Sequence, residues 1–315
     1  MFALGLYIAS FIIIWLGAGF IINGVDSFAK KLKISSFAIS FFILGILTSI
    51  PETSVGLTAI ANNDPEIYVG TLLGGVITMF LLVIPTLAIL GNGIKIQSNL
   101  DNGPLLLSLL VTMSPSILIA DKHISKTDSL IMLTLYIILF FFMQKKQGVL
   151  EALKKQMTAK KKVNYTKNFF LIIVGIVMVY YSGNLIVDNT LYFAELLHVT
   201  PFVISLLVLS IGTNLPELSL AIKSILSGKK DIAFGDYIGS AAANTLLFAL
   251  LSLLYGGSVN INGNFYITFF FIVCGLSLFY YFSRSKRNIS RKEGFMLFGL
   301  YIVFLFVELF KNNII

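Results

Sequence analysis

Long apolar runs alternate with short polar connections along the whole chain. A helix that crosses a bilayer needs about 20 mainly apolar residues, and the runs have this length. They predict an all-α integral membrane protein with ten transmembrane helices. The expected spans cover residues 3–23, 35–61, 67–91, 103–120, 127–144, 168–187, 201–226, 233–256, 265–283 and 293–310.

The composition agrees with a membrane protein. Of the 315 residues, 57% are hydrophobic and 12% are charged, against about 25% charged residues in soluble domains. The net charge of +8 would by itself suit a nucleic-acid-binding protein. The lysines, however, cluster in short connections between apolar runs, a pattern that sets membrane topology. We therefore expect membrane lipid, and no nucleic acid, as a partner.

Basic residues concentrate in the connections after the first, fifth, seventh and ninth spans, which include Lys30, Lys229 and Arg284. The longest connection, Gln144 to Lys167, carries eight lysines. It is either a solvated linker or a basic helix that lies on anionic lipid. The positive-inside rule predicts that these connections are cytoplasmic and that both termini are extracellular, in a multi-pass protein of the cell membrane.

Two segments, Leu47–Glu52 and Gly212–Glu217, lie 165 positions apart and share the pattern Thr-x-x-Pro-Glu. The same offset aligns the first three spans of each half without a gap. Because five spans separate the copies, and five is odd, the second copy enters the bilayer in the opposite orientation. The chain is thus predicted to contain a first inverted repeat (1–144), a basic linker (145–167) and a second inverted repeat (168–315).

Each copy of the pattern contains a proline inside an apolar run. A proline in a helix interior removes one backbone hydrogen bond and crowds the preceding turn, so Pro51 and Pro216 are expected to break or kink the second and seventh helices. The carbonyl groups near Leu47 and Gly212 would then be free. Such groups are tolerated at membrane depth only where they face protein or line a cavity, and they are hard oxygen ligands suited to sodium or calcium.

Each copy also contains a carboxylate at membrane depth. Of the fifteen acidic residues, we place only Glu52 and Glu217 deep inside apolar runs, and such residues mark ion or substrate pathways. Thr48 lies four residues before Glu52, and Thr213 lies four before Glu217, so each hydroxyl shares a helix face with its carboxylate. Two inverted copies would bring these groups together near the bilayer centre. The alternative is a proline kink with a glutamate that serves packing, which would have to occur twice.

The spans that follow the two motifs carry small residues at helical spacing, Gly70 and Gly74 in one half and Gly235 and Gly239 in the other. Small residues let helices approach closely. This stripe by itself therefore predicts helix packing.

Next to the second stripe, Ser240 and Asn244 place two polar side chains on one helix face. We expect Asn244 to be a ligand rather than a packing group. The same register in the first half holds Gly75 and Met79, neither of which is polar. Asp236 is either an entrance carboxylate or an ordinary interfacial charge.

The segments Thr48–Glu52, Gly212–Glu217 and Gly235–Asn244 resemble the two alpha-repeats of the sodium/calcium exchanger family, which belongs to the calcium/cation antiporter superfamily. The resemblance covers nearly the whole chain in its span count, inverted repeats and central basic loop. It implies a ten-helix antiporter in which sodium entry drives calcium out, and thus a transporter rather than an enzyme.

The resemblance also implies which residues bind the transported ions. The two motif glutamates, Glu52 and Glu217, would bind calcium and sodium competitively. Thr48 and Thr213 would supply carbonyl and hydroxyl oxygens.

Three further positions match the ion-binding pattern of the family. Ser49 and Ser240 match sodium-ligand positions, and Asn244 matches an amide or carboxylate position of the second repeat. Calcium and sodium would be transported substrates, and no resident cofactor is expected. The oligomeric state stays open, and a monomer is compatible with an internal repeat.

The chain departs from the family pattern at four positions. Leu47 stands where the first motif usually has glycine, and Asn214, also a candidate ligand, stands where the second usually has serine. Gly75 replaces an expected serine, and Met79 replaces an expected asparagine or aspartate. Thr78 points about 100° away from Met79 on a regular helix, so it replaces the lost oxygen only if the helix shifts.

Other functions remain open from the sequence. A buried glutamate can take up a proton, so a proton/calcium or other cation/proton exchanger is the main alternative. A passive cation channel and a homologue that binds ions without transport are the others. The sequence has no phosphate loop, nucleophile elbow or HExxH motif, so we expect no enzymatic activity.

Overall fold

A computed structural model describes residues 2–29, 48–95, 102–146, 165–226, 230–261, 265–284 and 288–312. This part of the chain is helical apart from its connections and four strands of two residues each. Several predictions fall on residues outside it, among them the start of the second span, the lysines after the first span and most of the basic linker.

The helices follow the order of the apolar runs. Those of the first half are α1 (Phe2–Ala29), α4 (Ile50–Ala61), α5 (Glu66–Ile77), the π-helix η2 (Thr78–Val83), α6 (Ile84–Leu90), α7 (Asn102–Leu118) and α8 (Lys126–Lys146). Those of the second half are α10 (Tyr165–Leu196), α11 (Pro201–Ile204), the π-helix η3 (Ser205–Leu209), α12 (Ser210–Thr213), α13 (Leu215–Leu226), α14 (Lys230–Tyr255), α15 (Phe265–Arg284) and α16 (Arg291–Lys311).

Seven helices of the described part are long and apolar enough to cross a membrane, and two shorter apolar helices, Gly103–Leu118 and Pro201–Thr213, accompany them. The protein is therefore an all-α, multi-pass membrane protein, as its apolar runs predict. The count of ten spans stays a prediction.

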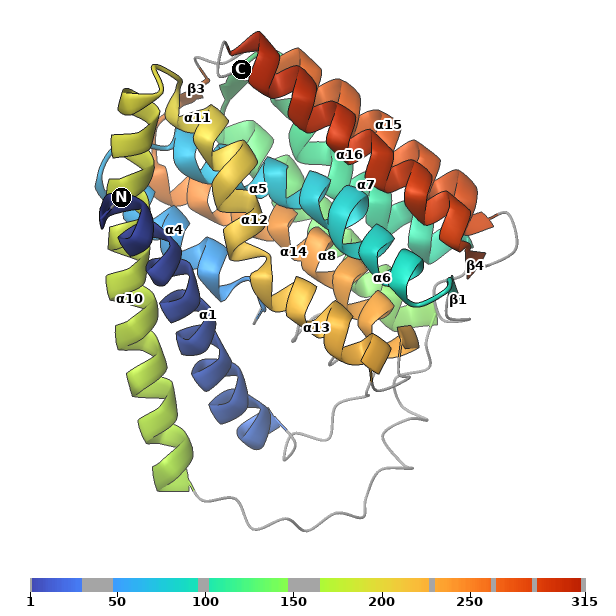
Figure 1. Ribbon diagram of the computed structural model, residues 1–315, viewed down its shortest axis with the longest axis horizontal. Coiled ribbons are helices and arrows are strands. Elements are labelled where there is room, and N and C mark those ends of the chain that lie inside the picture. Colours follow the sequence, from blue (N-terminus) through green and yellow to red (C-terminus); the bar gives the residue numbers. More distant parts are fainter. Residues whose placement is uncertain are drawn as a thin grey trace.

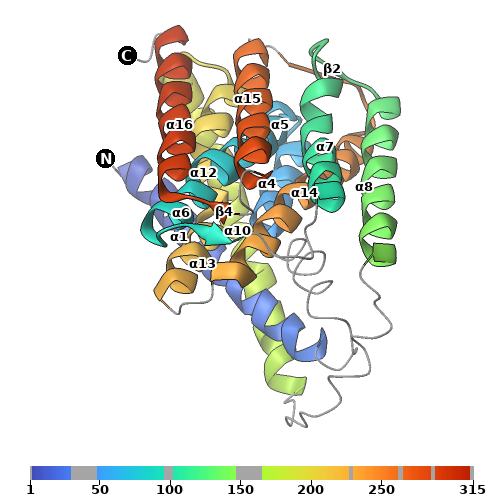
Figure 2. The same cartoon turned by 90° about the vertical axis from the view of Figure 1, so that its right-hand side faces the viewer.

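Helices α1 and α10 lie side by side along one flank, and one end of the pair extends beyond the other helices (Figures 1 and 2). Two glycines allow this close contact. A Cβ atom added at Gly17 would lie 2.9 Å from Cβ of Met178, and one added at Gly175 would lie 2.6 Å from the Gly17 carbonyl oxygen. A hydrogen bond of 2.7 Å between the hydroxyl groups of Tyr7 and Thr190 also joins the pair.

Helix α5 packs closely against α11, η3 and α12 of the other half. A Cβ atom added at Gly70 would lie 2.5 Å from the Phe202 carbonyl oxygen, and one added at Gly74 would collide with the Leu206 carbonyl oxygen. The expectation that Gly70 and Gly74 form a packing stripe is confirmed. Because these contacts are made by backbone atoms, they leave no room for a side chain.

Two short antiparallel bridges join the halves at opposite ends of the bundle (Figures 1 and 2). Strand β1 (Ile94–Lys95) pairs with β4 (Asn288–Ile289), and β2 (His123–Ile124) pairs with β3 (Val259–Asn260). The offset of 165 residues carries β1 onto β3 and β2 onto β4. It also carries one bridge onto the other with the same pairing register. The sequence repeat therefore has a counterpart in the three-dimensional structure.

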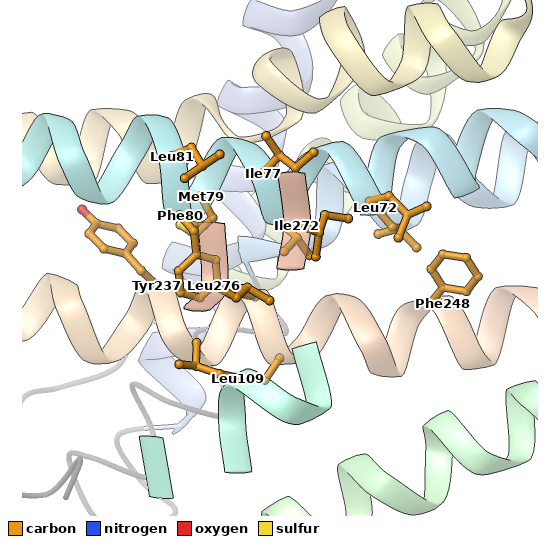
Figure 3. Close-up of a cluster of buried hydrophobic side chains, with 14 of the residues drawn as sticks. Leu72, Ile77, Met79, Phe80, Leu81, Leu109, Tyr237, Phe248, Ile272 and Leu276 are labelled. Atoms are coloured by element: carbon orange, nitrogen blue, oxygen red, sulfur yellow. The ribbon is translucent and has the colours of Figure 1, made fainter. Parts of the chain in front are cut away.

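The larger of two apolar clusters surrounds α5, η2 and α14. Figure 3 shows Met79 and Phe80 of η2 beside Leu276 of α15, close to α14. The ring of Phe80 contacts the ring of Phe279 edge-to-face, with 4.8 Å between ring centroids. Met79 is 1% exposed, so its side chain contributes to the apolar core.

Candidate functional site

The two motif segments have the same backbone conformation at equivalent positions. Ser49, which precedes α4, has φ −82° and ψ 14°, and Asn214, which separates α12 from α13, has φ −88° and ψ 13°. Pro51 and Pro216 each lie in the first turn of the helix that follows. A proline is tolerated there because the missing N–H would have no partner within the helix. Asn214 separates α12 from α13, whereas the chain before Thr48 lies outside the described residues.

The described carbonyl groups next to these positions accept hydrogen bonds from nearby residues of the same segment. The Gly212 carbonyl, which we expected to be free, accepts the backbone N–H of Asn214. The Ser49 carbonyl accepts both the backbone N–H of Thr53 at 3.0 Å and its hydroxyl at 2.7 Å. Leu47, where the other free carbonyl was expected, lies outside the described residues.

The fold brings the two motif glutamates together from opposite halves. Glu52 is 3% exposed and Glu217 is 1% exposed, and their carboxylates lie close enough to interact electrostatically. The side chain of Thr213 lies beside Glu52, at a geometry outside that of a hydrogen bond, and the side chain of Thr48 lies beside Glu217. Each carboxylate thus neighbours the motif threonine of the other half.

Helix α14 holds Glu217 in place. The hydroxyl of Ser240 donates to Oε1 of Glu217 at 3.2 Å, and the hydroxyl of Thr48 donates to Oγ of Ser240 at 3.5 Å. The hydroxyl of Tyr237 donates to the Glu217 backbone carbonyl at 3.3 Å. Tyr237 was not among the predicted site residues, although it precedes Ser240 by three residues and therefore lies close to the same helix face.

The amide groups of Asn214 and Asn244 lie close together beside Gly75. A Cβ atom added at Gly75 would lie 3.1 Å from the Asn244 amide nitrogen and 3.4 Å from that of Asn214. Asn214 also donates its amide to the Ser210 carbonyl at 2.8 Å. All eight predicted residues are buried, and they are Thr48, Ser49, Glu52, Thr213, Asn214, Glu217, Ser240 and Asn244.

Four buried oxygens of this group lack a hydrogen-bond partner within the described part of the chain. They are Oε2 of Glu52, Oε2 of Glu217, Oγ1 of Thr213 and Oδ1 of Asn244. A buried polar atom without a partner costs about 1–3 kcal/mol. Carboxylate, hydroxyl and amide oxygens are ligands that sodium and calcium prefer. The arrangement can therefore coordinate a cation, which would relieve this cost.

Thr78 does not replace the side-chain oxygen that the family pattern has at position 79. The π-helix η2 begins at Thr78, so the helix does shift there. The hydroxyl of Thr78 donates to Oγ of Ser210 at 3.3 Å, and Ser210 donates to the Leu206 carbonyl at 2.6 Å. Thr78 therefore bonds to the turn before Asn214 and does not take the place of the oxygen expected at position 79.

A further buried carboxylate was missed. Glu308 in α16 is 2% exposed, although it lies near the end of its apolar run rather than deep inside it. The Thr268 hydroxyl donates to Oε1 of Glu308 at 3.1 Å, and the Asn312 amide donates to Oε2 at 3.2 Å. Both oxygens are satisfied, so Glu308 joins α15 to α16. Its place near the end of an apolar run was the available signal.

Glu308→Gln tests this structural role. The neutral amide replaces a carboxylate that accepts hydrogen bonds from Thr268 and Asn312, so both hydrogen bonds lose a charged acceptor. We expect the free energy of unfolding to fall by about 1–3 kcal/mol, with ion transport retained. Thermal unfolding of the detergent-solubilised protein measures the first effect, and flux in proteoliposomes measures the second. Loss of transport at unchanged stability would contradict a structural role.

Two buried carboxylates, one from each half of an internally repeated membrane bundle, mark an ion or substrate pathway. The family model described as "Sodium/calcium exchanger protein" matches residues 2–145 and 167–310, two stretches of equal length that begin 165 residues apart. The chain belongs to the sodium/calcium exchanger protein family, and it is a membrane antiporter.

Two related antiporters align with nearly the full length of this chain. The sodium/calcium exchanger MaX1 of Methanosarcina acetivorans is 26% identical over 95% of this chain and 98% of its own. The putative antiporter CaxA of Alkalimonas amylolytica is 27% identical over 92% of this chain and 93% of its own. A solved structure of the sodium-calcium exchanger NCX_Mj has the same fold, with a TM-score of 0.67 and 23% identity over 96% of this chain and 97% of that one.

Proposed function

We propose that this antiporter exchanges sodium for calcium, with the ions bound near the bilayer centre between Glu52 and Glu217. The main support for this proposal is that each glutamate is buried beside the motif threonine of the other half. Each glutamate also has one carboxylate oxygen without a hydrogen-bond partner in the described part of the chain. Thr48, Ser240 and the remaining predicted residues complete the set of oxygen ligands.

The proposed architecture is ten transmembrane helices in two inverted repeats of five, residues 1–144 and 168–315, joined by the basic linker 145–167. The second and seventh helices would be interrupted at Ser49 and Asn214, whose matching backbone angles support equivalent roles. Inverted repeats permit two states of similar energy that open the site to opposite sides of the membrane. This is alternating access, and the site would lie on the axis that relates the two halves.

The proposed location is the cell membrane, with both termini outside and the basic connections in the cytoplasm, as the distribution of lysines indicates. Because a single chain supplies both glutamates, a monomer suffices for the proposed site. The name of MaX1 as a sodium/calcium exchanger supports the choice of ions.

The main alternative is a proton/calcium or other cation/proton exchanger. Two adjacent buried carboxylates cannot both stay ionised without a compensating cation. When calcium leaves, monovalent ions must replace it, and protons on Glu52 and Glu217 satisfy this demand as well as sodium does. The electrostatic interaction between the two buried glutamates favours this alternative as a second candidate function.

Calcium uptake into proteoliposomes separates these functions. Vesicles loaded with sodium and diluted into sodium-free buffer should accumulate calcium, whereas vesicles with only a pH gradient should not. The reverse result would reject sodium coupling in favour of protons. Uptake without any counter-ion gradient would indicate a channel, and uptake no greater than in protein-free vesicles would indicate a homologue that does not transport calcium.

A further inference from the structure

Three buried hydroxyl groups connect α16 to the second motif segment. Tyr301 of α16 places its hydroxyl group beside the side chain of Thr78, close enough to form a hydrogen bond. The hydroxyl of Thr78 donates to Oγ of Ser210 at 3.3 Å, and that of Ser210 donates to the Leu206 carbonyl at 2.6 Å. Because the hydroxyl proton of Thr78 is directed at Ser210, Tyr301 is the donor in the first contact. The donors therefore run in one direction, from α16 through η2 to α12.

This chain of hydroxyl groups passes between elements that pack directly against one another. Helix α16 packs against η2, and α12 packs against α5, so the helix formed by α5, η2 and α6 lies between them (Figure 1). Gly74 of α5 allows the close approach, because a Cβ atom added there would lie 2.8 Å from Oγ of Ser210. Gly74 precedes Thr78 by about one helical turn. The same close contact thus brings the hydroxyl groups of Thr78 and Ser210 together.

The hydrogen bond between Thr78 and Ser210 lies at the ends of two π-helices. Helix η2 begins at Thr78, and η3 ends at Leu209, the residue before Ser210. Such helices are rare and occur frequently at functional sites. The stretch of α14 that corresponds to η2 at the offset of 165 residues, 243–248, belongs to a regular α-helix. Ala243 stands there at the position of Thr78, so position 243 has no hydroxyl group for an equivalent link.

Ser210 begins the short segment that carries two candidate ligands, Thr213 and Asn214. Helix α12 spans Ser210–Thr213, and Asn214 follows it directly; we call Ser210–Asn214 the motif turn. The amide nitrogen of Asn214 donates to the Ser210 carbonyl at 2.8 Å, so the amide oxygen is the part of this side chain left for a cation. The side chain of Thr213 lies beside Glu52. A displacement of Ser210 would therefore move both candidate ligands.

We infer that Tyr301 and Thr78 are positioning residues for cation binding, because their hydroxyl groups hold the motif turn at Ser210. This inference rests on the proposed cation site between Glu52 and Glu217. Without the Tyr301 hydroxyl, that of Thr78 is free to turn to the backbone carbonyl four residues earlier, and Ser210 then loses its donor. Ligands have to be held within about 0.5 Å of the productive geometry. Loss of the chain should therefore lower the affinity for the ion.

Calcium binding to the detergent-solubilised protein, measured by isothermal titration calorimetry in sodium-free buffer, tests the inference. Tyr301→Phe and Thr78→Val each remove one hydroxyl group and keep the shape of the side chain. Loss of one hydrogen bond to the motif turn corresponds to a rise in the calcium Kd of about 3- to 10-fold. Size-exclusion chromatography checks that the variants fold. An unchanged Kd in either folded variant would overturn the inference, whatever the change in its unfolding temperature.

The variant that carries both substitutions distinguishes one chain from two independent contacts. If the hydroxyl groups act in series, the double variant should lose no more affinity than a single variant. Independent contributions would multiply to about 10- to 100-fold, and this outcome would overturn the inference. Thr78→Ser supplies the hydroxyl group without the methyl group and should recover the wild-type Kd. Failure to recover it would assign the effect of Thr78→Val to the methyl group, and this pair decides the question even if Tyr301→Phe does not fold.

Tyr136→Phe is the matched control from the other half. Tyr136 lies 165 residues before Tyr301 and is similarly buried, but Ala243 at the position of Thr78 has no hydroxyl group to continue a chain. The calcium Kd of this variant should stay within about twofold of the wild-type value. An equal loss of affinity in Tyr136→Phe and Tyr301→Phe would overturn the inference, because removal of any buried phenol hydroxyl would then suffice. A wild-type protein that binds no calcium would reject the proposed function itself, whereas wild-type binding with unaffected variants rejects only the positioning role.

Discussion

Glu52→Gln and Glu217→Gln should each abolish divalent exchange without unfolding the protein. Each substitution removes one of the two charges that face the cation and changes the side-chain volume little. Loss of one partner from a buried charge pair costs about 3–5 kcal/mol, which corresponds to a loss of calcium affinity of at least about 100-fold. The effect should be equally severe at the two positions, because each glutamate is buried beside the motif threonine of the opposite half.

Calcium flux in proteoliposomes and calcium binding by isothermal titration calorimetry both measure this loss. Glu308→Gln is the matched control, because it makes the same chemical change at a carboxylate equally buried but bonded to Thr268 and Asn312. It should keep exchange near the wild-type rate. Wild-type exchange by Glu52→Gln or Glu217→Gln would refute their assigned roles. Equal loss of exchange in all three variants, together with a lower unfolding temperature in each, would show that the change disrupts the fold.

Gly74→Ala should produce the second large effect, a loss of both stability and transport. The added methyl group collides with the Leu206 carbonyl oxygen and lies within 2.8 Å of Oγ of Ser210. Because the first obstacle is backbone, it cannot rotate away, and α5 must move from η3 and α12. Overpacking of this kind costs about 1–3 kcal/mol. The neighbouring residue, Gly75, lies against the amide groups of the candidate site, so the displacement should also weaken calcium binding.

Gly299→Ala is the control for Gly74→Ala. Gly299 lies within α16, and a Cβ atom added there meets nothing within 4 Å. This control gains about 1 kcal/mol of helix propensity, so its thermal unfolding temperature should stay the same or rise. Gly74→Ala should unfold at a lower temperature and exchange calcium more slowly. Equal unfolding temperatures in the two variants would mean that α5 and η3 can separate at little cost.

Local polarity made the candidate residues visible in the sequence. Glu52 and Glu217 stand out because a carboxylate is rare inside an apolar run, and the shared offset of their motifs shows that the two positions are equivalent. The same pattern could not place the prolines, which lie in the first turn of a helix rather than in its interior. It also overlooked Glu308, because an acidic residue near the end of an apolar run resembles an ordinary interfacial charge.

The sequence alone determined the all-α membrane class, the internal repeat and the eight candidate residues, since hydrophobic run length, charge distribution and a repeated motif are properties of the chain itself. Only the tertiary structure decided which of these side chains meet. Ser240 bonds to Glu217, Thr213 lies beside Glu52, and Met79 belongs to the apolar core. Contacts between the two halves depend on how the halves pack. The small-residue stripe that includes Gly74 predicts close helix packing, but the stripe does not show that its partner is the Leu206 carbonyl group of the other half.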